Sequence, residues 1–381
     1  MPSLLQLPLV PCKVKFEKGE ILLHSVLSEG DYGCVYRGTF YVNGGTGECA
    51  AKCCLKSSVS LPRLMFFRRE AVLHAHVSSG EGIVKLYDIF EDESFIWIIM
   101  KYYPEGDLWK AIVDGRFVGR DEYIRSIFSR ILKAVAYCHS QTVYHRDIKP
   151  ENILLDENGT KVFLADFGLA SGVKCSESWG GIFGLDLPYE GAPHDIWSLG
   201  VVLINMICSN YAPWKRATSQ DTAFRQFLVS PSSALARYPL SPQVCRLLER
   251  VFKVEPKQRI TLKDFQSAIT KIKVFSRQKE KPSRIRNIPR TVSGIFSYPF
   301  REKSCIISRR RLLEWTDAKE DSISESCYSI ESQAVTDLSH CCVSRFDSEL
   351  VADVEGPTVR LVGNFNPLYN ARRVIPDIMI G

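Results

Sequence analysis

Two polar motifs set in apolar surroundings, VYHRDIKPENILL and LADFG, constrain this chain more than any other part of its sequence. The first contains Asp147, Lys149 and Asn152, and the second contains Asp166. Phosphoryl transfer requires oxygen ligands for Mg²⁺, a carboxylate that accepts the proton of the attacking hydroxyl, and a cation beside the transferring phosphate. Asp166 and Asn152 can supply the oxygens. Asp147 can supply the carboxylate and Lys149 the charge, so the two motifs together indicate phosphotransfer.

Two weaker signals lie upstream of these motifs. Gly30 and Gly33 in SEGDYGCVY stand between two expected strands, where missing side chains let backbone N–H groups approach phosphate oxygens. A glycine in a hairpin also serves as an ordinary turn residue. Lys52 in CAAKCC lies in an apolar strand and needs an anion if it is buried, for which Glu70 is the candidate. The alternative is an exposed lysine at a sheet edge.

The hydrophobic pattern predicts an α+β fold with two parts. Between residues 15 and 100, five short apolar runs bounded by turn residues indicate strands, and LPRLMFFRREAVLHAHV indicates a helix after the third. Beyond Tyr103 the apolar residues recur with helical spacing, as in DEYIRSIFSRILKAVAYCHS. In SPQVCRLLERVF, Ser241 is expected to cap a helix that has Pro242 at its first position.

Taken together, these motifs resemble the eukaryotic protein kinases, over residues 20–270. The resemblance implies a two-lobed kinase fold that uses ATP and Mg²⁺. It implies that Asp147 is the catalytic base, that Lys149 steadies the γ-phosphate, and that Asn152 and Asp166 bind the metal. Asp195, in HDIWSLG, would anchor the catalytic loop. The residues expected to bind ATP are Leu27, Gly30, Gly33, Val35, Ala50, Lys52, Glu70, Met100, Tyr102 and Asp107.

Finer features of the resemblance concern the type of kinase and its substrates. Lys149, two places after Asp147, matches the serine/threonine class. MKYYPEGDLW and APWKRATSQDTAFRQFLVSP look similar to fungal kinases linked to nutrient sensing and meiosis. The expected partners are protein substrates, and Glu151 with Asp107 would favour basic residues near the target hydroxyl. A nucleic-acid partner for the basic residues 271–311 has only charge behind it, because no reader motif is present.

Residues 170–194 depart from the family pattern. This segment is shorter than in the family, and it lacks the Ala-Pro-Glu tripeptide that ends the family's peptide-docking segment. The family's glutamate pairs with an arginine, here Arg259, so we expect a buried charge without its partner unless Glu190 replaces it. Glu190 as a solvated loop residue is the competing interpretation. The chain is therefore either a working kinase or an ATP-binding scaffold, unless a coding segment is missing.

Regulation is indicated only in outline. In the family, an arginine at the position of Arg146 pairs with a phosphorylated residue of the activation loop. The hydroxyl groups expected to fill that role belong to Ser171, Ser176 and Ser178.

The organisation expected along the chain is an N-terminal extension at 1–14, a kinase domain at 15–274 and a low-complexity, serine-rich tail at 275–381. The domain would divide into lobes at 15–103 and 104–274. No apolar run is long enough to cross a bilayer, and the 13 cysteines are expected to be reduced thiols. We therefore expect a monomer located in the cytoplasm, the nucleus or both.

Overall fold

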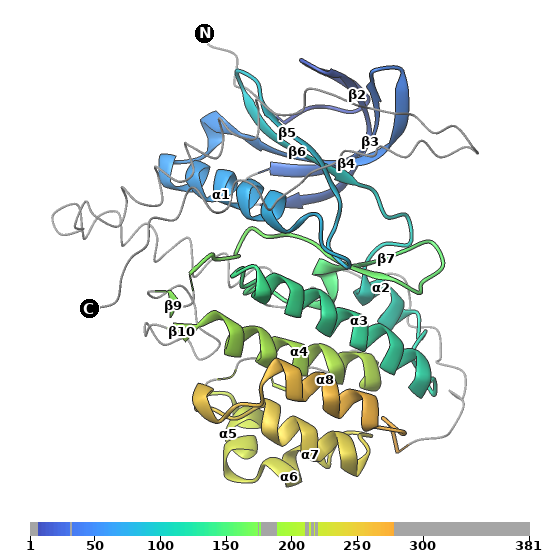
Figure 1. The fold of residues 1–381 in the computed structure, drawn as a ribbon, viewed down its shortest axis with the longest axis vertical. Helices are drawn as coiled ribbons and strands as arrows, with labels where there is room; N and C mark the ends of the chain where they lie inside the picture. Colours follow the sequence, from blue (N-terminus) through green and yellow to red (C-terminus); the bar gives the residue numbers. More distant parts are fainter. Residues whose placement is uncertain are drawn as a thin grey trace, which may run out of the picture.

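The structure is a computed structural model that describes residues 7–277 apart from 31–32, 174, 177–188, 210–212, 215–216 and 218–219. A sheet-containing part lies above a larger helical part in Figure 1. The sheet is antiparallel throughout, with the strand order β1-β2-β3-β4-β6-β5. Its strands are β1 (Cys12–Phe16), β2 (Gly19–Gly30), β3 (Gly33–Val42), β4 (Gly45–Leu55), β5 (Leu86–Glu91) and β6 (Phe95–Lys101). The α+β class is therefore confirmed.

The prediction of five strands in this sheet is wrong by one. The additional strand is β1, which begins inside the stretch expected to be an extension and pairs along its whole length with β2. Its sequence, CKVKF, alternates half-buried with exposed residues, as an edge strand with one covered face does. Val14 and Phe16 pack against the buried cluster of the sheet, which explains why the segment pairs.

Helix α1 (Leu61–Val77) covers the other face of the sheet. Phe67 and Ala71 are buried against Cys54, Ile96 and Ile98 of β4 and β6. This packing fixes which side of α1 faces the sheet, and Glu70 lies on that side because it is also buried.

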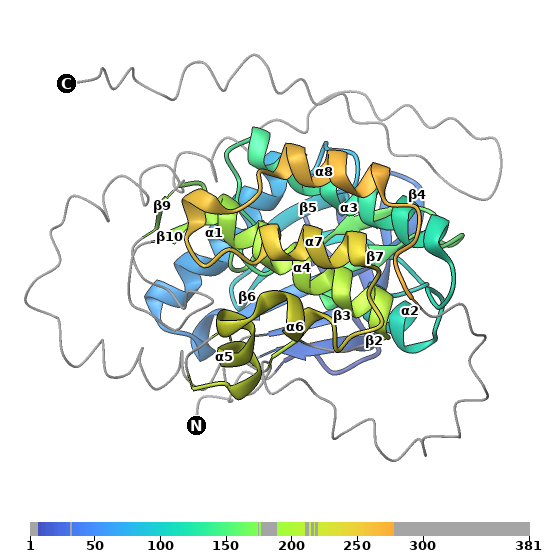
Figure 2. The ribbon, with the colours of Figure 1, turned by 90° about the horizontal axis from the view of Figure 1, so that it is seen from below.

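The helical part is built around α4 (Gly191–Cys208), most of whose residues are buried. Figure 2 shows α3 and α7 running beside α4, α8 beside α3 and α7, and the short α5 and α6 at one edge. The other elements of this part are α2 (Leu108–Val113), α3 (Asp121–Ser140), α5 (Thr222–Val229), α6 (Pro231–Leu235), α7 (Pro242–Val251), α8 (Leu262–Lys271), β7 (Ile153–Leu155), β8 (Val162–Leu164), β9 (Cys175–Ser176) and β10 (Tyr189–Glu190).

Local sequence signals explain where several of these helices begin. The Ser241 hydroxyl accepts a hydrogen bond from the Val244 amide at 3.3 Å, which confirms it as the N-cap of α7. Thr261 does the same for α8, since its hydroxyl accepts from the Asp264 amide at 3.1 Å.

The described core reaches beyond α8 to Phe275, which is fully buried. Its amide donates to the Asp121 carboxylate at 2.8 Å, at the start of α3. Residues 278–381, which hold nearly all of the expected tail, lie outside the described residues. In the part that the structure describes, no helix is both long enough and apolar enough to span a membrane.

Candidate active site

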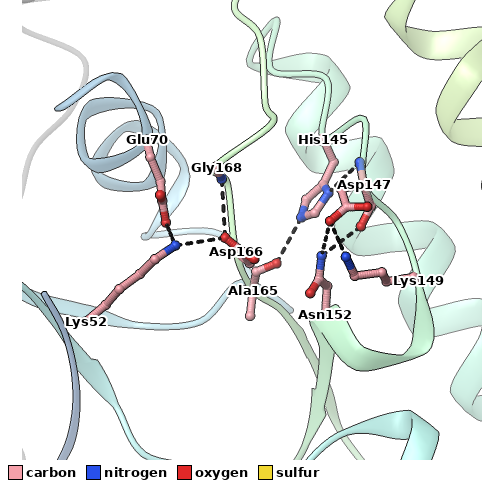
Figure 3. Close-up of polar contacts among 9 residues, drawn as sticks. All are labelled: Lys52, Glu70, His145, Asp147, Lys149, Asn152, Ala165, Asp166 and Gly168. Atoms are coloured by element: carbon pink, nitrogen blue, oxygen red, sulfur yellow. Dashed lines mark hydrogen bonds and ion pairs between the residues drawn. The ribbon is translucent and has the colours of Figure 1, made fainter. Parts of the chain in front are cut away.

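The first half of the site joins the sheet to the helical part through Lys52. Strand β4 carries Lys52, and its ammonium group donates to the Glu70 carboxylate of α1. The same ammonium group donates to Asp166 Oδ1 at 3.0 Å (Figure 3). The Lys52 and Glu70 side chains are 22% and 7% exposed, so the predicted anionic partner of a buried lysine is present.

The charges of this group keep Lys52 protonated. Burial alone would lower the pKa of Lys52, but the carboxylates of Asp166 and Glu70 raise it above its usual range. The Lys52 charge is also the main reason that the pKa of Asp166 lies far below its usual value. Asp166 is therefore ionised over the physiological range, and its side chain is 46% exposed, as a metal ligand needs to be.

The second half of the site surrounds Asp147. Lys149 Nζ donates to Asp147 Oδ2 at 2.5 Å, and Asn152 Nδ2 donates to the same oxygen at 2.9 Å. A further bond of 2.9 Å joins Asn152 Nδ2 to the Asp147 backbone carbonyl (Figure 3). These contacts hold the Asp147 carboxylate in one orientation, and they leave the Asn152 Oδ1 atom as the one able to face a cation.

A buried carboxylate, Asp195 of α4, fixes the backbone that presents Asp147. Its oxygens accept from the amides of His145 at 3.0 Å and Arg146 at 2.7 Å. Arg146 adopts a φ of 66°, a conformation that non-glycine residues adopt only when surrounding contacts stabilise it. These hydrogen bonds are the contacts through which Asp195 would anchor the loop of Asp147.

His139 and His145 are two members of this site that sequence reasoning missed. His139, at the end of α3, donates to Asp195 Oδ2 at 2.8 Å. His145 donates from Nε2 to the Ala165 carbonyl at 3.0 Å and accepts from the Asp147 amide at 3.3 Å. It thereby joins the loop of Asp147 to the segment of Asp166. His145 stands within the HRD motif, which could have identified it, whereas no local pattern identifies His139.

The residues expected around a nucleotide lie on neighbouring strands. Ala50 is the cross-strand partner of Met100, and Val35 is the partner of Lys52. Leu27 is 43% exposed on β2. Tyr102 follows β6 directly and is half-buried. Strand pairing therefore places Val35, Ala50 and Met100 close to Lys52 in the sheet.

Gly33 and Asp107 have local structural roles beside the expected ones. A Cβ atom at Gly33 would stand 1.7 Å from the Cys53 carbonyl oxygen, so only glycine permits this pairing of β3 with β4. Gly30 pairs with Gly33, and the two residues between them lie outside the described part. One carboxylate oxygen of Asp107 accepts from the Lys110 amide at 2.8 Å and caps α2.

Arg259 is buried, but the expected loss of compensation does not occur. Its guanidinium donates to the backbone carbonyls of Pro193 at 2.6 Å and Lys253 at 2.8 and 3.0 Å, and it lies over the Trp197 ring at 4.9 Å. Among the side chains that the structure describes, no carboxylate lies within ion-pair distance of Arg259, and Glu190 does not replace the family's glutamate. Burial lowers the pKa of Arg259 to about 10.

The candidate phosphorylation sites fare differently from one another. Ser171 is buried, with 4% of its surface exposed, and its backbone pairs with Tyr144. Its hydroxyl is therefore inaccessible to another enzyme in this conformation. The side chain of Ser176 and the whole of Ser178 lie outside the described residues.

The two-part fold and the assembled Lys52, Asp147, Asn152 and Asp166 side chains define a protein of the kinase class. A family model for the protein kinase domain matches residues 22–270, and the chain belongs to the protein kinase family.

Fungal serine/threonine kinases are among the relatives, as the resemblance implied, and the name of one relative refers to meiosis. The chain is 33% identical over 306 residues to the "Negative regulator of sexual conjugation and meiosis" of Schizosaccharomyces pombe, which covers 72% of this chain and 63% of that protein. It is 32% identical over 238 residues to the serine/threonine-protein kinase VHS1 of Saccharomyces cerevisiae, covering 55% of this chain and 50% of that one. Serine/threonine-protein kinase SKS1 of the same yeast is 30% identical over 236 residues, with 55% of this chain and 46% of that one covered. The chain thus spans about half to just under two thirds of these relatives.

Proposed function

We propose that this chain is a protein serine/threonine kinase that transfers the γ-phosphate of ATP to a hydroxyl group of a protein substrate. The observation that carries the proposal is the Asp147 carboxylate, held by Lys149 and Asn152, in the same site as the Lys52–Asp166 ion pair. The family match and the serine/threonine kinases among the relatives support the same activity.

The donor set of the site fits Mg²⁺ and ATP. Asp166 is ionised and partly exposed, and the amide nitrogen of Asn152 is engaged by Asp147, so both residues present oxygen to a hard cation. Bound Mg²⁺ supplies charge that stabilises the transferring phosphate. Lys52 supplies a positive charge for phosphate oxygens, and Glu70 keeps its ammonium group in place.

The chain's own residues would then act on the hydroxyl. The Asp147 carboxylate accepts the proton of the substrate hydroxyl. The Lys149 ammonium group, which donates to Asp147 Oδ2, stabilises negative charge on the transferring phosphate. Burial raises the pKa of Glu151, which lies near Asp107 and Lys149. These two acidic side chains support a preference for basic residues near the target hydroxyl. We also propose that the protein is a monomer located in the cytoplasm, the nucleus or both. Its kinase domain would include β1 from Cys12 and reach the buried Phe275, slightly beyond the expected limits of 15 and 274.

One observation favours a second candidate, an ATP-binding scaffold without transfer activity. The segment between Asp166 and Asp195 is short and lacks the family's docking tripeptide. The hydrogen bonds of Arg259 weaken this alternative, because its guanidinium has carbonyl partners at the start of α4 and after α7 among the described residues.

Transfer of labelled γ-phosphate to a degenerate serine/threonine peptide mixture tests the proposal. The full chain is compared with Asp147→Asn, and Asp114→Asn is the matched control at an exposed carboxylate. We expect Asp147→Asn to reduce transfer by about 100-fold or more while ATP still raises the melting temperature. Transfer equal in the full chain and in Asp147→Asn would contradict the assignment of Asp147. No transfer by the full chain, with stabilisation by ATP retained, would favour the scaffold.

A further inference from the structure

Two cysteines face each other across strands β3 and β4. Cys34 and Cys53 are cross-strand partners in the antiparallel register, and both belong to the same buried cluster on one face of the sheet. They are 3% and 0% exposed, and both are free thiols. Among the strands that the structure describes, no other two cysteines oppose each other in this way.

The spacing of the two strands permits a disulfide bond between these thiols. Directly opposed residues of antiparallel strands have Cα atoms about 4.5–5.5 Å apart and side chains on the same side of the sheet. Disulfides join residues whose Cα atoms are about 4.4–6.8 Å apart. The strands also approach each other closely here, because a Cβ atom at Gly33 would stand 1.7 Å from the Cys53 carbonyl oxygen. A bond between the two sulfur atoms therefore requires no slip or separation of β3 and β4.

The two thiols differ in their surroundings. Cys53 is fully enclosed, and burial raises its pKa to about 12. Burial also raises the pKa of Cys34, but a hydrogen bond with the Tyr36 side chain opposes this shift. The Tyr36 hydroxyl is itself fixed, because it donates to the Pro8 carbonyl at 3.0 Å. Cys34 is therefore the thiol of the pair that loses its proton more readily, and the thiolate is the form that reacts with oxidants.

The pair lies beside residues that are expected to surround the nucleotide. Val35 follows Cys34, Lys52 precedes Cys53, and Val35 and Lys52 are themselves cross-strand partners. Because side chains alternate along a strand, the two cysteines point away from the face that carries Val35 and Lys52. A covalent bond between the cysteines would therefore join the two strands at this point without occupying the nucleotide side of the sheet.

We propose that Cys34 and Cys53 are a peroxide-sensitive pair, which closes to a disulfide and holds the hairpin of β2 and β3 against the strand of Lys52. The Cys34 thiolate attacks one oxygen of hydrogen peroxide, the O–O bond breaks, and Cys34 becomes a sulfenic acid. The hydroxide that leaves takes up the proton released by Cys34. The Cys53 sulfur then attacks the Cys34 sulfur, the S–O bond breaks, and the hydroxyl group leaves with the Cys53 proton as a second water. The two thiols are oxidised by two electrons in total, and the peroxide is reduced by two. This inference goes beyond the proposed function and does not depend on it.

The test treats the full chain in its native state with hydrogen peroxide, stops the reaction with acid, and blocks the remaining thiols with N-ethylmaleimide in denaturant. Mass spectrometry without reduction then identifies joined tryptic peptides. Trypsin leaves Cys34 in residues 19–37, and it leaves Cys53 together with Cys54 in residues 53–56. We expect these two peptides to be joined in about half of the chains or more, and to separate on treatment with dithiothreitol. Recovery of both peptides as blocked thiols would overturn the inference, as would a bond from Cys34 to any other peptide.

Cysteine variants identify the partner of Cys34 within residues 53–56. Cys54→Ser removes the neighbouring thiol, which belongs to the buried cluster on the opposite face of β4, and it should leave the amount of joined peptide unchanged. Cys53→Ser and Cys34→Ser should each reduce that amount about tenfold or more. Joined peptide that is lost in Cys54→Ser and retained in Cys53→Ser would overturn the assignment. The unaltered chain decides whether the bond forms even where a variant fails to fold.

Hydrogen exchange measures whether the bond holds the hairpin. We expect the amides around Val35 to exchange about threefold or more slowly in the oxidised chain, because opening of β3 would require two linked strands to move together. Exchange in α7 should stay the same. Cys34→Ser treated with peroxide is the matched control, and it should exchange at the rate of its untreated form. Equal rates around Val35 before and after oxidation of the unaltered chain would overturn the holding role.

Discussion

Arg259 is a buried cation in the helical part of the molecule. Its guanidinium donates hydrogen bonds to backbone carbonyls and lies over the face of the Trp197 ring. A guanidinium has five N–H donors in a fixed plane, so it can satisfy several carbonyls at once. This explains how Arg259 is accommodated although no carboxylate among the described residues lies within ion-pair distance of it. The carbonyls of Pro193 and Lys253 depend on Arg259 in return.

Replacing Arg259 with methionine should therefore destabilise the fold. The carbonyls of Pro193 and Lys253 would lose their hydrogen bonds to the guanidinium, and we expect the free energy of unfolding to fall by about 2–3 kcal/mol. Urea denaturation measures the change, and Arg246→Met at an exposed position is the control. A loss no larger than that of the control would show that water or a shifted backbone satisfies these carbonyls.

Acidification should destabilise the chain through His74. Burial lowers the pKa of His74 to about 4 in the folded chain, and the hydrogen bond to Val84 opposes this shift in part. The charged or titratable groups near His74 are Lys52, Asp166 and His145. The unfolded chain, in which histidine has a pKa of about 6.5, binds this proton more readily. Stability from this source is complete above about pH 6.5 and is lost as the pH falls toward 4.

Denaturant unfolding at a series of pH values measures this dependence. His74→Leu should show a shallower loss of stability between pH 6.5 and 4 than the unaltered chain, whereas His76→Leu should show the same slope. Parallel curves for His74→Leu and the unaltered chain would mean that His74 takes up no proton on unfolding.

At the level of elements, α8 begins at a cap that its sequence specifies. The Thr261 hydroxyl accepts from the Asp264 amide at 3.1 Å and donates to the Asp264 carboxylate at 2.8 Å. This reciprocal pair satisfies an amide at the helix start that has no partner within the helix.

Thr261→Ala should lower the free energy of unfolding by about 1 kcal/mol, because the Asp264 amide loses its acceptor. Thr270→Ala is the matched control near the other end of the helix, where the hydroxyl only donates to the Ser267 carbonyl. Thermal or urea unfolding of the two variants measures the difference. Equal effects at both positions would contradict a specific role for the cap.

Strand β1 forms because of its pairing with β2 and not because of its own sequence. Five residues with two lysines are a weak strand signal by themselves. The segment becomes a strand because β2 extends far enough to pair with it, and because the Tyr36 hydroxyl donates to the Pro8 carbonyl at 3.0 Å just before it.

At the level of the whole molecule, the core of the described residues reaches past the end of α8 to Phe275. The Arg125 guanidinium donates to the carbonyls of Ile272 and Lys273, and the Ser241 amide donates to the carbonyl of Phe275. These contacts join the segment after α8 to the starts of α3 and α7.

A chain ending at residue 277 keeps every contact described for this segment and is the reference for a shorter chain. A chain ending at residue 270 loses the buried Ile272 and Phe275, and we expect its stability to fall by about 3–5 kcal/mol. Urea unfolding of the two shortened chains measures the difference. Equal midpoints would show that Phe275 contributes no net stability.

The sequence by itself determined the chemistry of the site and the class of the fold. Asp147, Lys149 and Asn152 lie within one short loop, and Asp166 follows in a nearby motif, so their spacing along the chain already constrains their spacing in space. Hydrophobic periodicity is also a local property, which is why α1, α3, α7 and most strands could be predicted.

Only the tertiary structure decided the features that depend on distant segments. The partners of Arg259 come from residues 193, 253 and 254, and the contacts of His74 come from residues 84 and 167. The edge position of β1 depends in the same way on β2. Burial and pairing across the fold set the energy of such groups, and no local pattern in the sequence records which segments will meet.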